Sequence, residues 1–406
     1  MTRELKVSLF TADNDLFSME QEWNGLLQKS SADTIFLTWE WVSSWWKIHK
    51  KSNQQLFMLF IREGNELIGI APLYCSKIRF LTLLTAKRLD YIGFGTLDSE
   101  YMDFIIEKGK EKEVLTAVFN YLKQYESKWD VLYLYEMPES AVTLPLLTPL
   151  AAENGYSILE TRHECSSVQL PSDWDTYLST MDSKFRYQLR HSTKRLEEGH
   201  TVEFGYCNSE DNLATDLESL YKLHQKHWIG KDIEGSFINM QRRSFYYEIS
   251  RLFLSKGWLR LFGLKVDGEY KAQQFSFEYA GKIFSLQEGY DPDWKKKRVG
   301  QVLRGYVFRD IISRGLTEYD FLGGISPHKK TWEAKAKYSV NLRLSKQGFK
   351  TKLFLEIPVF IKKVRLTIKG LLPSRLVKLR RDYKDKQYKD NLKKRVNQQE
   401  STDAGE

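Results

Sequence analysis

The stretch from Trp258 to Trp332 constrains the fold most, because three strand-like runs in it lead into a basic glycine loop and a helix. Two turn signals, Asp267-Gly268 and Ala280-Gly281, separate the runs, which are Trp258–Val266, Tyr270–Tyr279 and Lys282–Tyr290. The loop KKKRVGQ opens an amphipathic helix that we expect over Gln301–Arg314. Free N–H groups and the positive dipole end at such a helix start favour a bound pyrophosphate. The stretch therefore predicts a phosphate-binding unit.

The whole chain alternates strand-like and helix-like segments, which predicts mixed α/β layers. Residues 56–77 and 259–282 both show a strand, a glycine-containing turn and a second strand, and each follows helical sequence. This similarity favours a duplicated domain, and the competing interpretation is that two unrelated hairpins look alike. We predict a division into residues 1–164, residues 165–349 and a tail over residues 350–406.

The positive charge of the chain lies in its tail. Residues 350–406 hold 16 of the 62 Lys and Arg residues and 7 of the 53 acidic residues, so the remaining chain carries 46 of each sign. A neutral body argues against a nucleic-acid ligand for the globular part. The tail mixes apolar and basic residues, which favours a membrane surface, although a packing helix or an RNA-binding end would show the same pattern.

Targeting and metal-binding signals are weak in this sequence. The start lacks a long apolar run and no segment has the length of a membrane span, so we expect a cytoplasmic protein, or one peripheral to the inner face of the plasma membrane. Cys75, Cys165 and Cys207 stand far apart, as expected for reduced thiols. His224 and His227 lack further ligands nearby, so no metal site is predicted.

Several strings in order resemble the GNAT superfamily of acyl-CoA-dependent acyltransferases, and more specifically its CelD (BcsL)-type branch with tandem GNAT-like domains. They are FLTWEWVSSWW, DSEYMDF, SKFRYQLRHSTKRLEE, VDGEYKAQQFSFEYAGKIFSLQEGYDPDWKKKRVGQVL and YDFLGGISPHKKTWEAK. The resemblance implies two domains, each with a mixed, largely antiparallel sheet flanked by helices. It also implies that the second domain binds the acyl-CoA. The first half lacks a comparable basic loop after its later strands, so we expect its domain to be degenerate.

The resemblance places the cofactor site in the loop and at a bend before it. The family's loop pattern, Q/R-x-x-G-x-G/A, matches at Lys297, Gly300 and Val302, and valine departs from the small final residue. The competing interpretation of this loop is a solvated basic turn. The strand bend falls near Leu286 to Glu288, where an ordinary central strand is the alternative. The residues expected to contact acetyl-CoA or another acyl-CoA are Leu286, Gln287, Lys297, Arg298, Val299, Gly300, Gln301, Val302 and Leu303.

Acyl transfer from a thioester needs a proton acceptor for the amine, a donor to the oxyanion and an acid for the thiolate. The candidates beside the expected site are His328, Glu288, Asp320 and Tyr290. His328 titrates near neutral pH, but it could also be a surface histidine at a helix start. Asp320 could orient a substrate or anchor the following glycine turn.

Two further groups have both functional and structural interpretations. Arg186, Arg190 and Lys194 form a basic stripe on the helix expected over Ser183–Glu198, which suits an anionic acceptor or a solvated face. The tryptophans around Trp41 and Trp45 could stack on sugars, but aromatic residues at helical spacing favour a core.

Together these features predict an N-acyltransferase that acts on a sugar-derived or cell-envelope polysaccharide precursor. The acceptor would be a small molecule or a lipid- or nucleotide-linked sugar. The alternatives are a Fem-like aminoacyl-tRNA-dependent peptidyltransferase and a non-catalytic accessory protein of polysaccharide biosynthesis.

Overall fold

The computed structural model describes residues 4–80, 84–96, 98–229, 236–346 and 348. Residues 1–351 form one compact unit. The predicted tail over residues 350–406, with its membrane interpretation, lies outside the described residues.

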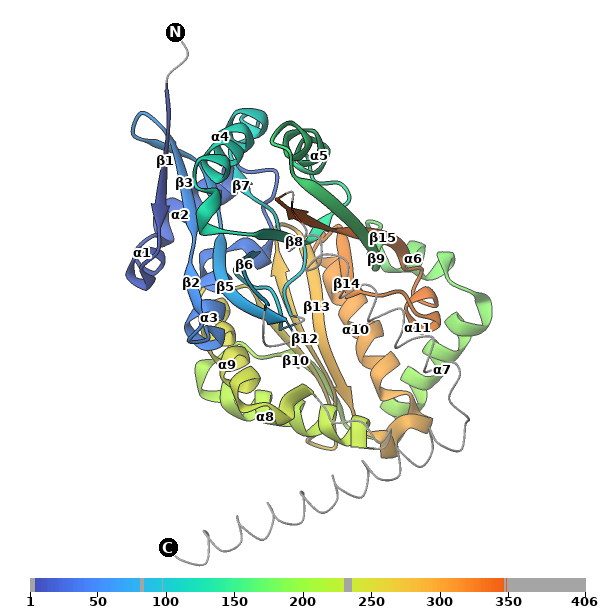
Figure 1. The fold of residues 1–406 in the computed structure, drawn as a ribbon. Coiled ribbons are helices and arrows are strands. Elements are labelled where there is room, and N and C mark those ends of the chain that lie inside the picture. The colour runs from blue at the N-terminus through green and yellow to red at the C-terminus, as the bar shows by residue number, and fades with distance from the viewer. Residues whose placement is uncertain (1–3, 81–83, 97, 230–235, 347, 349–406) are drawn as a thin grey trace, which may run out of the picture. The chain divides into compact units, whose positions relative to one another are not determined.

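The described strands and helices follow the expected alternation (Figure 1). The strands are β1 (Leu5–Phe10), β2 (Gln54–Leu56), β3 (Met58–Glu63), β4 (Glu66–Ala71), β5 (Leu73–Phe80), β6 (Leu84–Tyr91), β7 (Ile105–Ile106), β8 (Val131–Pro138), β9 (Ser157–Gln169), β10 (Val202–Tyr206), β11 (Leu259–Val266), β12 (Glu269–Tyr279), β13 (Lys282–Tyr290), β14 (Glu318–Gly323) and β15 (Lys335–Ser345). The α-helices are α1 (Asp13–Phe17), α2 (Glu20–Lys29), α3 (Trp39–His49), α4 (Glu111–Gln124), α5 (Leu144–Glu153), α6 (Trp174–Thr180), α7 (Ser183–Gly199), α8 (Glu210–Ile229), α9 (Met240–Ser255), α10 (Val299–Ser313) and α11 (Pro327–Lys330). Four 3-10 turns complete the described elements: η1 (Ile35–Leu37), η2 (Glu126–Lys128), η3 (Ser236–Ile238) and η4 (Pro292–Lys297).

Within the described ranges the strands form two sheets. The larger has eleven strands in the order β10-β11-β12-β13-β14-β9-β15-β8-β6-β5-β2, and the smaller has the order β1-β3-β4-β7. Only the pairs β13–β14 and β6–β8 are parallel among the described ladders, and one of them lies in each half of the chain. The predicted class is confirmed: the fold is mixed α/β, with largely antiparallel sheets flanked by helices.

The large sheet continues through both halves of the chain. β9 pairs with β14 on one side and β15 on the other, and β15 also pairs with β8. The predicted boundary between residues 164 and 165 falls inside β9. The division into two domains stays a prediction, since residues 1–351 form one unit.

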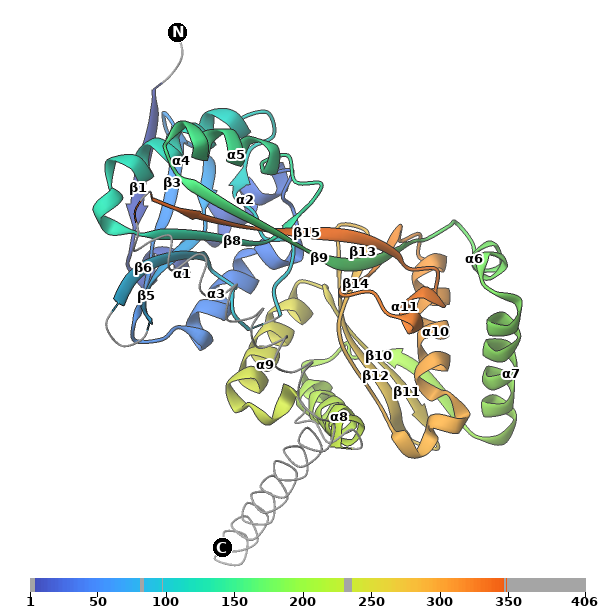
Figure 2. The same cartoon turned by 45° about the vertical axis from the view of Figure 1, so that its right-hand side comes forward.

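Helices cover both faces of the second half of this sheet. Figure 2 shows α8 on one side of β11, β12 and β13, and α10 with α7 on the other. Alternating residues supply the two cores because successive side chains of a strand point to opposite faces. Phe275 and Phe277 join the cluster that includes α8 and α9, whereas Ala272 and Ile283 join the cluster around α10.

The tryptophans of α3 belong to the core, as their helical spacing predicts. The side chains of Trp41, Trp45 and Trp46 are buried. Trp41 packs edge-on against Phe245, with ring centroids 5.1 Å apart. The indole N–H of Trp41 donates a hydrogen bond to Ser99 Oγ at 2.8 Å. The core interpretation is confirmed for Trp41 and Trp46, whose rings are fully enclosed and not available for stacking on a ligand.

The strand β13 departs from regular pairing near its centre. Leu286 is skipped in the register with β12, because Phe275 pairs with Gln287 and Ser276 with Ser285. On its other side β13 pairs with β14 only over residues 282–284. The two strands therefore separate beyond Phe284, and the edge of β13 from Ser285 to Tyr290 has no described ladder partner on that side. A bulge and a parted parallel pair leave backbone groups of β13 open to a ligand.

Gly289 allows α8 to pack closely on this strand. A Cβ added at Gly289 would lie 2.6 Å from the backbone nitrogen of His224 and 3.0 Å from the Leu223 carbonyl carbon. Since a backbone cannot yield as a side chain does, we expect Gly289→Ala to lower the free energy of unfolding by about 1–3 kcal/mol. Urea unfolding measures this change. Gly300→Ala is the control, since the nearest atoms to its Cβ belong to the Tyr290 side chain, at an ordinary contact distance of 3.6 Å. Equal stability of the two variants would contradict the prediction.

Candidate active site

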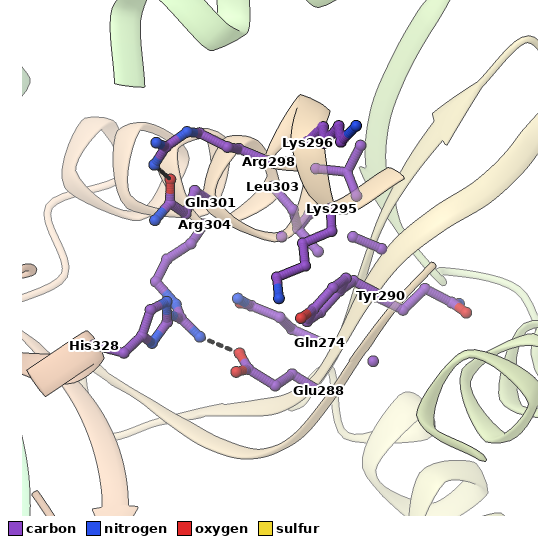
Figure 3. A pocket seen from close by; sticks show the side chains of 15 residues that line it. Gln274, Glu288, Tyr290, Lys295, Lys296, Arg298, Gln301, Leu303, Arg304 and His328 are labelled. Carbon is purple, nitrogen blue, oxygen red and sulfur yellow. Dashed lines mark hydrogen bonds and ion pairs between the residues drawn. The ribbon is translucent and has the colours of Figure 1, made fainter. Parts of the chain in front are cut away.

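A cavity of about 760 Å³ lies where β12, β13, η4, α10 and α11 meet (Figure 3). Its lining is dominated by polar and basic side chains. The lining residues are Ala272, Gln273, Gln274, Glu288, Gly289, Tyr290, Lys295, Lys296, Arg298, Val299, Gly300, Gln301, Leu303, Arg304 and His328.

The start of α10 forms one wall of the cavity. Arg298 precedes the helix in the left-handed conformation, with φ of 57°, and this turns the chain from η4 into α10. Val299 and Gly300 are the first helical residues, so their N–H groups have no acceptor within the helix. Lys295 and Lys296 line the same end of the cavity. Neither lysine forms an ion pair with a carboxylate in the part of the chain that the structure describes.

Three charged or titratable side chains from β13, α10 and α11 meet at another part of the cavity wall. Arg304 forms an ion pair with Glu288, and its Nη1 lies 3.3 Å from both ring nitrogens of His328 (Figure 3). The Arg304 side chain is 3% exposed, whereas that of Glu288 is 50% exposed. The Arg304 guanidinium carbon also lies 5.1 Å from the ring centroid of Phe321, within cation–π range. Arg304 is therefore held from several sides, and Glu288 remains open to the cavity.

The charge of Arg304 controls the protonation of its neighbours. Removal from water raises the pKa of the Glu288 carboxyl, but the charges of Arg304 and His328 outweigh this effect and bring the pKa below its usual value. Removal from water and the charge of Arg304 lower the pKa of His328. At neutral pH the site thus holds an ionised carboxylate beside a neutral imidazole.

The structure places most of the predicted site residues at this cavity. Glu288, Tyr290, His328, Arg298, Val299, Gly300, Gln301 and Leu303 all line it. Leu286, Gln287, Lys297, Val302 and Asp320 do not line it. The functional roles of all these residues stay predictions.

The predicted residues outside the lining have other contacts. Leu286 packs against the larger hydrophobic cluster, and Val302 is 1% exposed in the cluster around α10. Val302 therefore does not face a ligand in the cavity. The ammonium of Lys297 lies 4.2 Å from the ring centroid of Trp294 and 2.6 Å from His200 Nε2.

Asp320 lies in a separate buried cluster. Its Oδ1 accepts hydrogen bonds from the Leu322 N–H at 2.8 Å and from the Tyr101 hydroxyl at 3.1 Å. Its Oδ2 accepts from Lys337 Nζ at 2.5 Å. These contacts match the structural alternative, in which Asp320 anchors the chain before the glycine turn.

Arg304 is the principal site residue that we did not predict from the sequence. It lies in α10 between Leu303 and Val307, both of which are buried. A charged residue in an apolar helical stripe must find a partner or shift its pKa. A buried arginine in this stripe could therefore have been suspected from the sequence. Its partner could not, because Glu288 lies on another element, the strand β13. Gln274 was also missed, and its Oε1 accepts a hydrogen bond from the buried Tyr319 hydroxyl at 3.3 Å.

The basic stripe of α7 lies outside the cavity lining. Arg186 Nη1 donates to the carbonyl oxygens of Leu178 and Ser179 at 3.2 and 3.3 Å. Arg190 lies 4.0 Å from Asp175, and both side chains are well exposed. Both interpretations of the stripe, an anion site and a solvated face, stay open.

Within the described residues, no group of three or more His, Cys, Asp or Glu residues could hold a metal ion. The helices in the described ranges include none that is long and apolar enough to cross a membrane.

Residues 183–330 match the family model of the acetyltransferase (GNAT) domain. The match runs from α7 to α11 and includes every residue that lines the cavity. The segment that carries the cavity is therefore similar to GNAT acetyltransferase domains. No curated protein sequence matches the chain.

Solved structures agree with this fold. FemX is similar over 79% of this chain and 95% of its own, with a TM-score of 0.55 and 13% identity. A conserved protein of unknown function from Bacteroides thetaiotaomicron VPI-5482 covers 84% of this chain and 100% of its own, with a TM-score of 0.51 and 13% identity. A tandem GNAT protein from the clavulanic acid biosynthesis pathway covers 85% of this chain and 100% of its own at 12% identity, with a TM-score of 0.43. The likeness of fold rests on the first two.

Proposed function

We propose that this protein is an acyl-CoA-dependent N-acyltransferase that uses the cavity between β13 and α10. One observation carries the proposal: the open edge of β13, the helix start at Val299 and a basic lining meet in one cavity inside the matched GNAT segment. An acyl-CoA would supply a thioester that carries the activated acyl group. Among acyl-CoA molecules we favour acetyl-CoA as the co-substrate. The basic side chains and the helix start that line the cavity suit the phosphate groups of such a molecule.

The phosphate-binding role belongs to the start of α10. The N–H groups of Val299 and Gly300 can donate to phosphate oxygens, and the helix dipole favours negative charge there. Lys295, Lys296 and Arg298 add positive charge at the same end of the cavity. Backbone groups of β13 from Glu288 to Tyr290 can hold the amide-containing arm, because these residues line the cavity and β14 no longer pairs with them.

His328 and Glu288 are suited to different tasks in amine acylation. A neutral imidazole can accept a proton, and the low pKa of Glu288 keeps its carboxylate charged. We assign His328 the role of the base that removes a proton from the acceptor ammonium group. The carboxylate of Glu288 attracts and positions that ammonium group. Arg304 holds both residues by its ion pair with Glu288 and its contact with the His328 ring. Direct attack by the amine then needs no covalent enzyme intermediate.

We further propose that the acceptor is a sugar-derived or cell-envelope precursor, as the resemblance to the CelD-type branch implies. A half-exposed carboxylate in a basic cavity favours an acceptor that carries an amine. A thermal-shift screen of acyl-CoAs, followed by turnover assays with amino sugars, identifies both partners. Stabilisation by aminoacyl-tRNA, with no shift from any acyl-CoA, would contradict this proposal and favour the Fem-like alternative.

The decisive experiment places a negative charge at the start of α10. Gly300→Asp directs a carboxylate toward the position expected for phosphate, so we expect at least a tenfold loss of acetyl-CoA affinity by calorimetry. Gly300→Ala is the matched control, because the nearest atoms to its methyl group are those of Tyr290, at ordinary van der Waals distance. Unchanged binding by Gly300→Asp would overturn the phosphate site.

A further inference from the structure

A second cavity, of about 350 Å³, lies in the other half of the large sheet, beside α3 and the start of α9. The elements that bound it, α3, β5, β6 and α9, are labelled in Figure 1. Its lining is polar with several aromatic rings and shares no residue with the first cavity. The described lining residues are Trp45, His49, Lys51, Gln54, Tyr74, Arg88, Phe94, Gly95, Thr96, Asp98, Asn239, Gln241 and Arg242.

A buried ion pair in this cavity keeps unsatisfied polar atoms. Asp98 Oδ1 accepts hydrogen bonds from Arg242 Nη2 and from the Tyr246 hydroxyl, the latter at 2.8 Å. The second oxygen, Asp98 Oδ2, and the Nε–H of Arg242 are both buried, and neither has a partner at hydrogen-bond distance among the described residues. The Thr96 side chain lies close enough to Asp98 to favour its charged form. The Asp98 side chain is 0% exposed.

These two atoms, Asp98 Oδ2 and Arg242 Nε, indicate which hydrogen-bonding groups a ligand in this cavity would carry. A buried polar atom without a partner lowers the stability of the folded protein, so the free acceptor and the free donor of this ion pair are both destabilising. A group that both donates and accepts can satisfy the two atoms. Hydroxyl groups on neighbouring carbons have this property.

The buried charges of this cavity are paired within the protein, and Lys51, the remaining cation of the lining, is exposed to solvent. Arg242 pairs with Asp98, and Arg88 Nε donates to Asp90 Oδ2 at 2.7 Å. Removal from water and the charge of Arg242 lower the pKa of His49 to about 4, so its ring is neutral at physiological pH. These pairings favour an uncharged, hydroxyl-bearing ligand over a phosphate or a second ammonium.

Aromatic side chains provide an apolar surface beside the polar pair. Phe94 stacks on Tyr135 with ring centroids 4.2 Å apart, and the Arg88 guanidinium lies 5.8 Å from the Phe94 centroid. Trp45 Nε1 donates to Thr96 Oγ1 at 3.1 Å, which fixes the indole beside the same loop. A sugar ring has C–H faces that suit aromatic walls and hydroxyl edges that suit Asp98 and Arg242.

We infer that this second cavity binds a neutral saccharide ring, with hydroxyl groups on Asp98 and Arg242 and a ring face beside Phe94. The site is separate from the proposed acyl-transfer cavity, and the inference stands whether or not that cavity binds acyl-CoA.

Saturation-transfer difference NMR on the full chain tests the inference with D-glucose, D-galactose, D-mannose and N-acetyl-D-glucosamine. We expect saturation transfer to the ring protons of at least one sugar at millimolar concentration. Asp98→Asn removes an acceptor at nearly constant shape and Phe94→Ala removes an aromatic wall, so each is expected to weaken binding at least tenfold. Glu288→Gln, in the other cavity, is expected to leave the sugar signal unchanged.

A thermal melt of each variant separates loss of binding from loss of folding. If Asp98→Asn does not fold, Phe94→Ala decides, because Phe94 is only partly buried. The inference is overturned if no sugar shows transfer. It is equally overturned if both folded variants bind as the wild type does, or if inorganic phosphate displaces the bound sugar.

Discussion

Replacement of Arg304 by methionine is expected to reduce kcat/KM for acyl transfer at least 100-fold. Methionine fills much of the buried volume between Phe321 and Trp332 but removes the charge that pairs with Glu288. Without that charge the pKa values of both Glu288 and His328 should rise toward those of ordinary side chains. A pH profile of kcat/KM should therefore show its acid limb at higher pH, together with the loss of rate.

The control for this prediction lies on the same helix. Arg309 is exposed in α10 and does not line the cavity, so Arg309→Met should retain full activity. Breaking a buried pair can also cost stability, but half of the Glu288 side chain is exposed and can be hydrated. We therefore expect urea unfolding to show a loss smaller than the roughly 3–5 kcal/mol that breaking a fully buried pair costs. Wild-type kcat/KM and an unshifted pH profile in Arg304→Met would show that the pair is structural.

Substitution of His328 by glutamine should lower kcat about 100-fold, which is the usual loss when a general base is removed. The sign of the pH dependence follows from the lowered pKa of His328. Below that pKa the imidazole is protonated and cannot accept a proton, so wild-type activity should fall as the pH drops through a value under 6.5. Rate measurements from pH 5 to pH 8 should show this acid limb in the wild type and its absence in His328→Gln.

The neighbouring Lys330 gives the matched control for His328. It is exposed on α11 and absent from the cavity lining, so Lys330→Gln should keep both the rate and the acid limb. Calorimetry with acetyl-CoA should give similar affinities for wild type and His328→Gln, since we place the histidine in proton transfer. A His328→Gln enzyme with an unchanged acid limb would assign that limb to another group.

The elements around the site could be predicted well from the sequence. The expected strand Lys282–Tyr290 coincides with β13, and the helix expected over Gln301–Arg314 corresponds to α10 at Val299–Ser313. Alternating apolar residues, glycine turns and a glycine-containing helix start are local signals. The predicted phosphate loop has five of its residues in the cavity lining, from Arg298 to Leu303 with Val302 excepted.

The inner wall of the site could not be predicted in the same way. Arg304 and Glu288 are sixteen residues apart and lie on a helix and a strand whose packing brings them together. Lys297 matches the loop pattern, but it turns toward His200 and Trp294. Asp320 and Tyr101 form a hydrogen bond although they are 219 residues apart in the chain.

The sequence by itself determined the local elements: the three strands, the turns between them and the helix that starts at a basic glycine loop. The tertiary structure decided which side chains share a cavity and how both halves contribute to one large sheet through β9 and β15. The physical reason is the separation along the chain of the residues that interact. Backbone conformation and alternating burial follow from neighbouring residues, whereas a buried ion pair, a parted strand edge and a shared sheet depend on contacts between distant segments.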